Sequence, residues 1–421
     1  YGMTPFAMRY GGHQFGQWAG QLGDGRAINL GRFNGGAVSQ WFQLKGAGLT
    51  AYSRTADGMA VLRSSIREYI CSEAMHGLGV PTTRAISLAV TGDRVIRDKF
   101  YNGNALPEPG AVVCRVSPSF LRFGSIEIFV AFGEPEQARE LLDYLIQYHY
   151  PSLTQAASPA TELFEQLCAG TAYLVAKWQS LGFVHGVMNT DNMSLIGETI
   201  DYGPFGWIDW PDDDFTPNTS DRAGRYAYGQ QAAVARWNLM CLASALVHLG
   251  GDRDRLIAAL EGFEGQFQAA YEQEMSRKLG LAVANSSQVS AFDALCREHK
   301  LDWTRTLALL EYRTDHEDLS SQIASCSYAS TPSTEAAIAA FVDQWRAASP
   351  SFEQATNPVF IPRNYVIQQA IDPAEQGDYA VLRELAEAVV APTAISLDHP
   401  WAAIVPKDDN AVRCNQLSCS S

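Results

Sequence analysis

The fold is decided by the stretch His185-Gly186-Val187-Met188-Asn189-Thr190-Asp191-Asn192, which is followed nine residues later by Asp201-Tyr202-Gly203. A helical pattern over residues 160–181 ends at Gly182 and leads into this stretch. Two short apolar segments, 193–196 and 199–200, predict strands before Asp201. The order of helix, loop, strand, turn, strand and aspartate predicts a cleft that gathers the polar side chains of both runs.

These runs resemble the catalytic loop of protein kinases, His-Arg-Asp-Leu-x-x-x-Asn, and the metal-binding triplet Asp-Phe-Gly that follows it. Aligned on His185 and Asn192, the two metal ligands are retained as Asn192 and Asp201, whereas the catalytic aspartate becomes Val187. We therefore expect the chain to bind a nucleotide with Mg²⁺. It need not transfer the γ-phosphoryl group, because the expected base is missing.

The first part of the chain has the order of a kinase small lobe. Residues 20–28 predict two short strands around an Asp-Gly turn, where small residues let backbone N–H groups approach phosphate; a plain hairpin is the alternative. Residues 41–45 alternate as a strand that ends at Lys45. A helical period over 61–75 carries Glu68 near its middle, and we expect Glu68 to pair with Lys45 rather than to be a solvated helix residue.

Further along, residues 84–97 predict a strand, a Thr-Gly-Asp turn and a second strand, and residues 111–116 predict another strand of an antiparallel sheet. Helical periods follow over 134–148, 160–181 and 230–249, and helical segments continue through Glu387. We predict an α+β, protein-kinase-like fold of two lobes. Its parts are a small lobe at 1–130, a helical large lobe at 131–330, and a helical extension with a cysteine-containing tail at 331–421.

Composition limits the class of protein. The chain has 421 residues, is 47% hydrophobic and carries a net charge of −15, which argues against nucleic acid or an anionic membrane as the main partner. The longest largely apolar stretch, 237–251, is too short to span a bilayer. Eight cysteines without paired close spacing favour a reducing compartment. The chain starts without an initiator Met, so we expect a fragment of a longer protein.

Several motifs together resemble the selenoprotein O family across essentially the whole chain. They are Gly-Gly-His-Gln-Phe-Gly at 11–16, Gln-Leu-Gly-Asp-Gly-Arg-Ala at 21–27, the run at 185–194, Asp-Tyr-Gly-Pro-Phe-Gly at 201–206, Ser-Asp-Arg-Ala-Gly-Arg-Tyr at 220–226 and the C-terminal Cys419-Ser420-Ser421. The resemblance implies a kinase-like fold that transfers AMP from ATP to Ser, Thr or Tyr hydroxyls of proteins. It also implies a nucleotide bound in the orientation opposite to that in kinases, so that pyrophosphate leaves.

Residue by residue, the resemblance implies that Lys45 and Glu68 orient the phosphates and that Asn192 and Asp201 bind Mg²⁺, with Mn²⁺ as the alternative metal. Asp191 would be the proton acceptor, although it could instead be an outer-sphere metal ligand or cap the loop. The nucleotide pocket would be lined by Gly23, Gly25, Arg26, Lys45, Asp57, Gly58, Arg115 and Arg122. Arginine suits this role because its planar fork binds phosphate oxygens in pairs.

Three functions stay open from sequence: a protein adenylyltransferase, with UMP transfer from UTP not separable from it; a kinase for a protein or small molecule; and an inactive scaffold. Retention of Lys45, Glu68, Asn192 and Asp201 argues against the scaffold. Cys419 occupies the position where some relatives carry selenocysteine. Together with Cys414, it suggests redox control of the enzyme by a partner that acts on the tail; the alternative is that both cysteines are incidental. Cysteine at this position suggests a bacterial cytoplasmic protein; a mitochondrial form would need a presequence.

Overall fold

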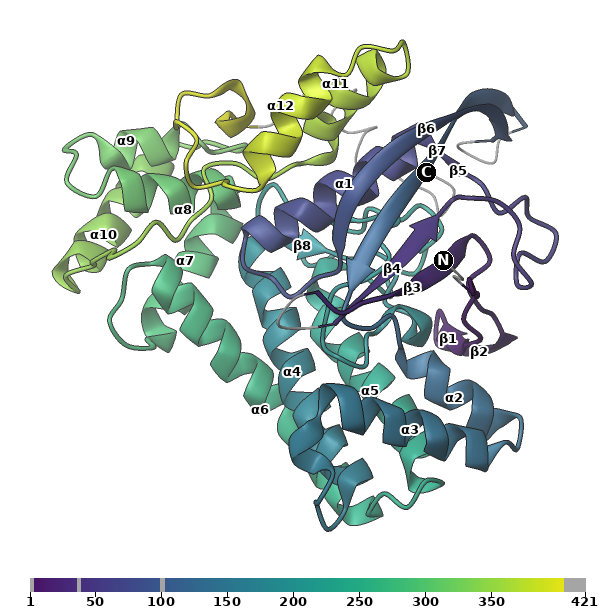
Figure 1. Cartoon of the computed structure of the whole chain (residues 1–421). Coiled ribbons are helices and arrows are strands. Elements are labelled where there is room, and N and C mark those ends of the chain that lie inside the picture. Colours follow the sequence, from purple (N-terminus) through teal and green to yellow (C-terminus); the bar gives the residue numbers. More distant parts are fainter. Residues whose placement is uncertain (1–3, 36–38, 99–102, 405–421) are drawn as a thin grey trace.

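The computed structural model describes residues 4–35, 39–98 and 103–404. It is a mixed α+β structure in which an antiparallel sheet forms most of the N-terminal part and helices form most of the remainder (Figure 1). This agrees with the predicted fold class at the level of sheet and helix order. The C-terminal cysteines Cys414 and Cys419 lie outside the described residues.

The main sheet has five strands in the order β3-β4-β7-β5, with β6 also paired to β7, and every pairing is antiparallel. Its strands are β3 (Ala27–Phe33), β4 (Gln40–Lys45), β5 (Ala60–Val61), β6 (Arg84–Arg97) and β7 (Leu106–Ser117). Helix α1 (Leu62–Gly77) follows β5 directly and packs against β6 and β7. The predicted strand ending at Lys45 and the helix carrying Glu68 are both confirmed.

The glycine-rich segment 20–28 does not form the hairpin that its sequence predicts. Strand β2 (Gln17–Gln21) pairs with β1 (Gly11–Gln14), whereas β3 pairs with β4, so the two predicted strands belong to different sheets. The Asp-Gly pair is no solvent-exposed turn, because Asp24 is 2% exposed and accepts a hydrogen bond from the Met8 backbone. The chain reverses at Phe15 and Gly16 instead, both of which have positive φ.

Two further local predictions were wrong. The Thr-Gly-Asp sequence at 91–93 does not reverse the chain, since β6 runs on through it and only its register with β7 shifts between Val90 and Arg94. A bulge with Gly92 at φ 86° accommodates the extra residues there. The segments 193–196 and 199–200 form only isolated bridges, such as the one between Met193 and Thr199. They are too short to extend a ladder.

The helical part begins after β7 and frames the loop at 185–192 (Figure 1). Helix α4 starts with Pro159 in its first turn and ends at Gly182, whose φ of 74° is the left-handed cap that glycine favours. After Gly182 the chain forms β8 (Phe183–Val184), which pairs with β9 (Gly206–Trp207). The loop and Asp201 belong to the segment that connects these two strands. The elements here are α2 (Phe123–Ala131), α3 (Pro135–His149), α4 (Pro159–Leu181), the short 3₁₀ helix η2 (Thr190–Asn192) and α5 (Gln231–Val247).

The remaining helices extend this core. They are α6 (Arg253–Lys278), α7 (Ser286–Glu298), α8 (Trp303–Tyr312), α9 (Leu319–Ala324), α10 (Thr334–Ala347), α11 (Asn364–Ala374) and α12 (Ala380–Val389). Helices α7 to α10 share a separate apolar core, whereas α11 and α12 return to pack on α1 beside the sheet (Figure 1). The C-terminal helices therefore buttress the helix that carries Glu68.

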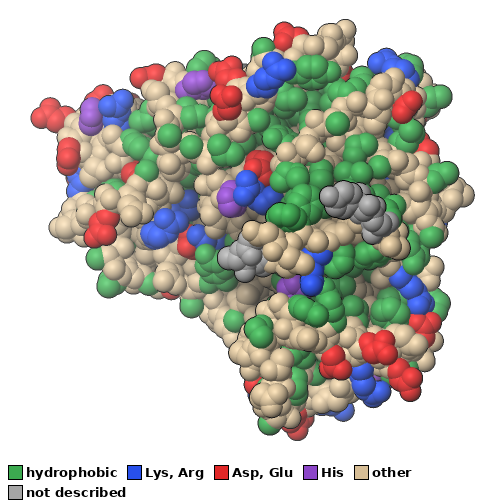
Figure 2. Space-filling model, viewed as in Figure 1, with side chains coloured by type: hydrophobic (Ala, Val, Ile, Leu, Met, Phe, Trp, Pro, Cys, Tyr) green, Lys and Arg blue, Asp and Glu red, His purple; other side chains and the backbone are tan. Residues whose placement is uncertain are grey.

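No helix in the described part of the chain is long and apolar enough to cross a membrane. On the face shown in Figure 2, Lys and Arg side chains are dispersed among acidic ones and do not gather into one basic patch.

Candidate active site

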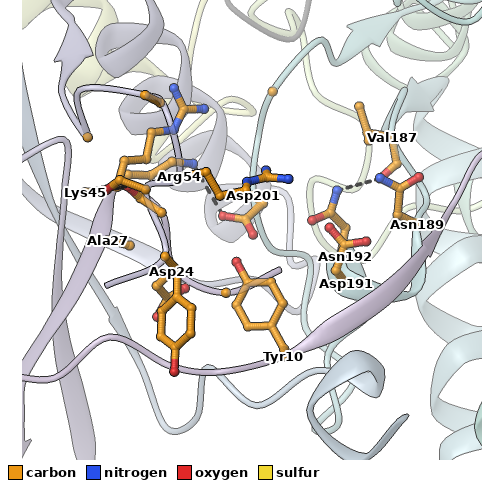
Figure 3. Close-up of a pocket in the computed structure, with 18 of the residues that line it drawn as sticks. Tyr10, Asp24, Ala27, Lys45, Arg54, Val187, Asn189, Asp191, Asn192 and Asp201 are labelled. Atoms are coloured by element: carbon orange, nitrogen blue, oxygen red, sulfur yellow. Dashed lines mark hydrogen bonds and ion pairs between the residues drawn. The ribbon is translucent and has the colours of Figure 1, made fainter. Parts of the chain in front are cut away.

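A cavity of about 770 Å³ lies between the main sheet and the loop at 185–192. Figure 3 shows Lys45 and Asp24 entering it from the sheet side, and Asp191, Asn192 and Val187 from the loop side. Most of the predicted site residues line this cavity: Gly23, Gly25, Arg26, Lys45, Asp57, Gly58, Arg115, Asp191, Asn192 and Asp201. Glu68 and Arg122 are absent from its wall and lie behind it.

The predicted ion pair between Lys45 and Glu68 is present. Lys45 Nζ lies 2.8 Å from Glu68 Oε2 and 3.3 Å from Asp201 Oδ1. Burial lowers the pKa of Lys45, and the carboxylates of Glu68 and Asp201 oppose that shift. Because both partners are largely buried, the pair fixes the ammonium group at the cavity wall, where it can face a phosphate.

Asp201 is the acceptor on which three cations converge. Arg122 Nη1 donates to its Oδ2 at 2.7 Å, and Arg115 and Lys45 both contact its Oδ1. Burial alone would raise the pKa of Asp201, but these three cations outweigh burial and hold that pKa well below its usual range. Asp201 also has φ 57°, a left-handed conformation that is uncommon outside glycine. The carboxylate is therefore ionised and held facing the cavity.

The two predicted nucleotide arginines occupy different places. Arg115, on β7, lines the cavity. Its guanidinium lies 2.9 Å from Glu68 Oε1 and also donates to Asp201 and Gln43, so it links these three side chains. Arg122, at the start of α2, is 1% exposed and donates to the Asp191 carbonyl oxygen at 2.8 Å. Arg122 thus supports Asp191 and Asp201 from behind and does not line the cavity, contrary to the sequence-based expectation.

The loop itself is held by hydrogen bonds at both ends. His185 Nε2 lies 2.9 Å from the Ile200 carbonyl oxygen, and its Nδ1 accepts from the Val187 backbone N–H. This pattern requires a proton on Nε2. Asn192 donates through Nδ2 to the Val187 carbonyl oxygen at 2.9 Å (Figure 3), and no described residue donates to its Oδ1, which can therefore accept or ligate.

Asp191 combines burial with an unused acceptor. It is 7% exposed; its Oδ2 accepts from Gln14 Nε2 at 3.3 Å, whereas its Oδ1 has no hydrogen-bond partner among the described residues. Burial raises the pKa of Asp191 to about 6, against the opposing influence of Arg122. A carboxylate with this pKa can accept a proton near neutral pH.

The glycine-rich wall shows why small residues are needed there. Gly23 has φ 124°, and a Cβ at this position would lie 2.4 Å from the Tyr52 ring. Gly58 has φ 72°, and a Cβ there would lie 2.1 Å from the Gly48 carbonyl oxygen. Asp57 lines the cavity, but its carboxylate is already paired with Arg97 at 2.7 Å. The backbone at 23–26 and 57–58 is therefore packed tightly around the cavity.

Comparison with known protein families matches residues 1–390 to the family described as "Protein adenylyltransferase SelO". The chain belongs to this family. It is 46% identical over 443 aligned residues to the "Protein nucleotidyltransferase YdiU" of Xylella fastidiosa (strain 9a5c). The proteins of the same name from Xanthomonas axonopodis pv. citri (strain 306) and Azoarcus sp. (strain BH72) are 46% and 45% identical over 451 and 445 residues. Each alignment covers 100% of this chain and 85% of the relative.

The SelO-family chain is accordingly a protein nucleotidyltransferase, and its adenylyltransferase activity implies the use of ATP. The donor set at the cavity fits a divalent cation. The ionised carboxylate of Asp201 and the Oδ1 of Asn192, to which no described residue donates, are hard oxygen ligands of the kind that Mg²⁺ prefers.

Sequence reasoning missed the residues that organise the site from the N-terminal hairpin. Gln14 binds Asp191, and the Phe15 backbone N–H donates to the Tyr226 hydroxyl at 2.8 Å, which in turn donates to Asn189. The only signals were the polar residues of the motifs at 11–16 and 220–226. Nothing local in either motif indicates that the two segments meet at the loop.

Proposed function

We propose that this SelO-family chain transfers AMP from ATP to Ser, Thr or Tyr hydroxyls of proteins and releases pyrophosphate, within a protein-kinase-like two-lobed fold. The observation that carries this proposal is the position of Asp191. The kinase base position holds the apolar Val187, and the buried carboxylate that lines the cavity from the same loop is Asp191 instead. The site keeps cationic phosphate-binding groups but presents its base from a different residue than a kinase does.

In the proposed reaction the acceptor hydroxyl oxygen attacks the α-phosphorus of ATP. The bond between that phosphorus and the oxygen bridging to the β-phosphate breaks, and pyrophosphate leaves with the electron pair. The hydroxyl proton passes to the carboxylate of Asp191, which lines the cavity. Asp191 would work as general base because its raised pKa keeps it basic enough to accept this proton.

The cations of the site would stabilise the charge that develops on the phosphate oxygens. Lys45, held by Glu68, and Arg115, held by Glu68 and Asp201, supply preorganised positive charge in a largely buried setting. The tight backbone at Gly23, Gly25, Arg26, Asp57 and Gly58 would surround the nucleotide. The nucleotide would lie in the orientation opposite to that in kinases, with its α-phosphate toward the acceptor.

Asn192 and Asp201 would hold Mg²⁺, or Mn²⁺, through Oδ1 and the carboxylate respectively. When bound, the cation would neutralise phosphate charge and help to orient the phosphates. Lys45 and Arg115 both contact Asp201 Oδ1. We expect these contacts to rearrange when the nucleotide and the cation bind.

The test is incubation of the purified protein with Mg²⁺ and ATP labelled at either the α- or the γ-phosphate, in the presence of candidate protein acceptors. Transfer of α-label alone, lost in Asp201→Ala and retained in the exposed control Asp343→Ala, supports the proposal. Transfer of γ-label would make the protein a kinase, and transfer of neither would favour a scaffold. The same assay with α-labelled UTP decides whether UMP is also transferred.

We also propose a bacterial cytoplasmic location, because the relatives named above are bacterial proteins. Redox control through Cys419 stays a prediction. Mass mapping of oxidised and reduced protein, combined with Cys419→Ser, tests whether this thiol forms a disulfide.

A further inference from the structure

A second cluster of ligand-type side chains lies outside the nucleotide cavity. His13 on β1, Glu127 on α2 and Cys241 on α5 each offer one ligand atom, and these three atoms lie within 4.8 Å of one another. None of the three residues lines the cavity. Because the residues come from three elements that are far apart in the sequence, their meeting is a product of the tertiary structure.

The carboxylate of Glu127 is the strongest sign that this cluster holds a ligand. Its side chain is 4% exposed; Oε1 lies 2.9 Å from His13 Nδ1, and Oε2 is buried with no hydrogen-bond partner among the described residues. A buried carboxylate oxygen without a partner costs free energy unless a cation or water satisfies it. A simple His13–Glu127 ion pair would satisfy Oε1 and leave Oε2 unexplained.

We propose that His13, Glu127 and Cys241 form a binding site for a transition-metal cation of the Zn²⁺ class, separate from the nucleotide-associated Mg²⁺ site. Nitrogen, oxygen and sulfur donors together suit Zn²⁺ rather than Mg²⁺. Ligands in a tetrahedral Zn²⁺ site lie about 3.3–3.8 Å apart. The present separations are at most 4.8 Å, which exceeds that spacing by about 1.0–1.5 Å, a difference that side-chain adjustment can close.

The surroundings favour a stable, three-ligand site with one position left for water. The His13 ring packs against Trp18 at 5.0 Å and Trp237 at 5.5 Å between ring centroids, which limits its movement and shields the site. Glu127 and a Cys241 thiolate would balance the two charges of the cation. Three protein ligands plus water is the arrangement of an open zinc site.

The proposed site would hold the β1–β2 hairpin against the catalytic loop. The His13 backbone N–H donates to Thr190 Oγ1 at 2.8 Å, and the next residue, Gln14, binds Asp191. Helix α2 lies beside β1 in the fold and contacts both β1 and η2 (Figure 1). A cation that joins His13 to α2 and α5 would therefore restrain the residues that orient Asp191.

The decisive experiment is a Co²⁺ titration of the full chain, in Mg²⁺-containing buffer, with Cys414→Ser and Cys419→Ser removing the tail thiols. Thiolate ligation of Co²⁺ gives a charge-transfer absorption that the oxygen ligands of the nucleotide site cannot produce. We expect one equivalent of Co²⁺ to generate this band. It should vanish in Cys241→Ser, weaken at least tenfold in apparent affinity in Glu127→Gln and His13→Ala, and persist in the control Cys114→Ser.

Circular dichroism of each variant establishes that loss of the band is not loss of folding. Absence of a thiolate band, or its persistence in Cys241→Ser, would overturn the proposed site. The restraint on the hairpin has its own readout, hydrogen exchange of residues 11–21 with and without Zn²⁺. Slower exchange with Zn²⁺ in the parent protein, and no change in Cys241→Ser, supports the restraint; unchanged exchange in the parent overturns it.

Discussion

At the scale of single residues, Asp191 shows how burial changes the chemistry of a carboxyl group. Burial raises its pKa to about 6, whereas the neighbouring Asp201, surrounded by Arg122, Arg115 and Lys45, has a pKa held well below its usual range. In the proposed reaction the two carboxylates divide the work: Asp191 accepts a proton, whereas Asp201 stays an anion.

This division predicts the pH dependence of the reaction. The base must be deprotonated, so kcat/KM for AMP transfer should fall as the pH drops through about 6 and level off above it. Asp191→Asn should lower kcat by about 10²–10⁴-fold. An initial-rate series from pH 5 to 8 measures both effects, and a fully active Asp191→Asn enzyme would contradict the assignment.

A second prediction at this scale concerns Glu68, which binds both Lys45 and Arg115 in the interior. Glu68→Gln leaves these cations partly unpaired and should lower the free energy of unfolding by about 1–3 kcal/mol, together with kcat/KM for ATP. The control is Glu165→Gln, whose partner Arg255 is solvent-exposed, and its effect should stay below about 1 kcal/mol. Urea denaturation measures the difference; equal effects of the two variants would be inconsistent with a buried, site-organising pair.

At the scale of elements, the β1–β2 hairpin approaches the loop at 185–192 more closely than any side chain at Gly12 would allow. A Cβ on Gly12 would lie 2.4 Å from Asp191 Oδ1. Gly12→Ala should therefore displace Asp191 or the hairpin and reduce kcat by about 10–100-fold, in line with the sensitivity of rates to small misplacements. Gly265→Ala on α6, where a Cβ meets nothing within 4 Å, is the control and should keep full activity. Steady-state kinetics and circular dichroism of both variants separate misplacement from unfolding.

At the scale of the whole molecule, the C-terminal helices pack against the part of the chain that carries Glu68. Helices α11 and α12 pack on α1, and Leu385 of α12 is fully buried in the core that they share. Leu385→Ala should lower the free energy of unfolding by about 2–5 kcal/mol because it leaves a cavity. Glu387→Ala, on the exposed face of the same helix, should change it by less than about 0.5 kcal/mol. Thermal or urea unfolding that shows no difference between them would mean that α12 is not part of the cooperative core.

The sequence by itself determined the elements whose signals are local. The alternation that ends at Lys45, the helical period around Glu68 and the glycine that ends α4 each depend on neighbours within a few residues, and the structure has all three. The spacing of Asn192 and Asp201 likewise placed both at one cavity, since the short segment between them folds back on itself through the bridge between Met193 and Thr199.

Only the tertiary structure decided which elements meet. The Gly-rich segment at 20–28 divided between two sheets, because Asp24 bonds the backbone of Met8 and the side chain of Gln43 rather than facing solvent. Arg122 became a support behind the cavity, and Gln14 reached Asp191 across 177 residues of sequence. Burial of apolar surface over the whole chain determines which elements pack together. Each polar group buried in this way is stable only if it forms a hydrogen bond or ion pair with a group that the packing brings near it.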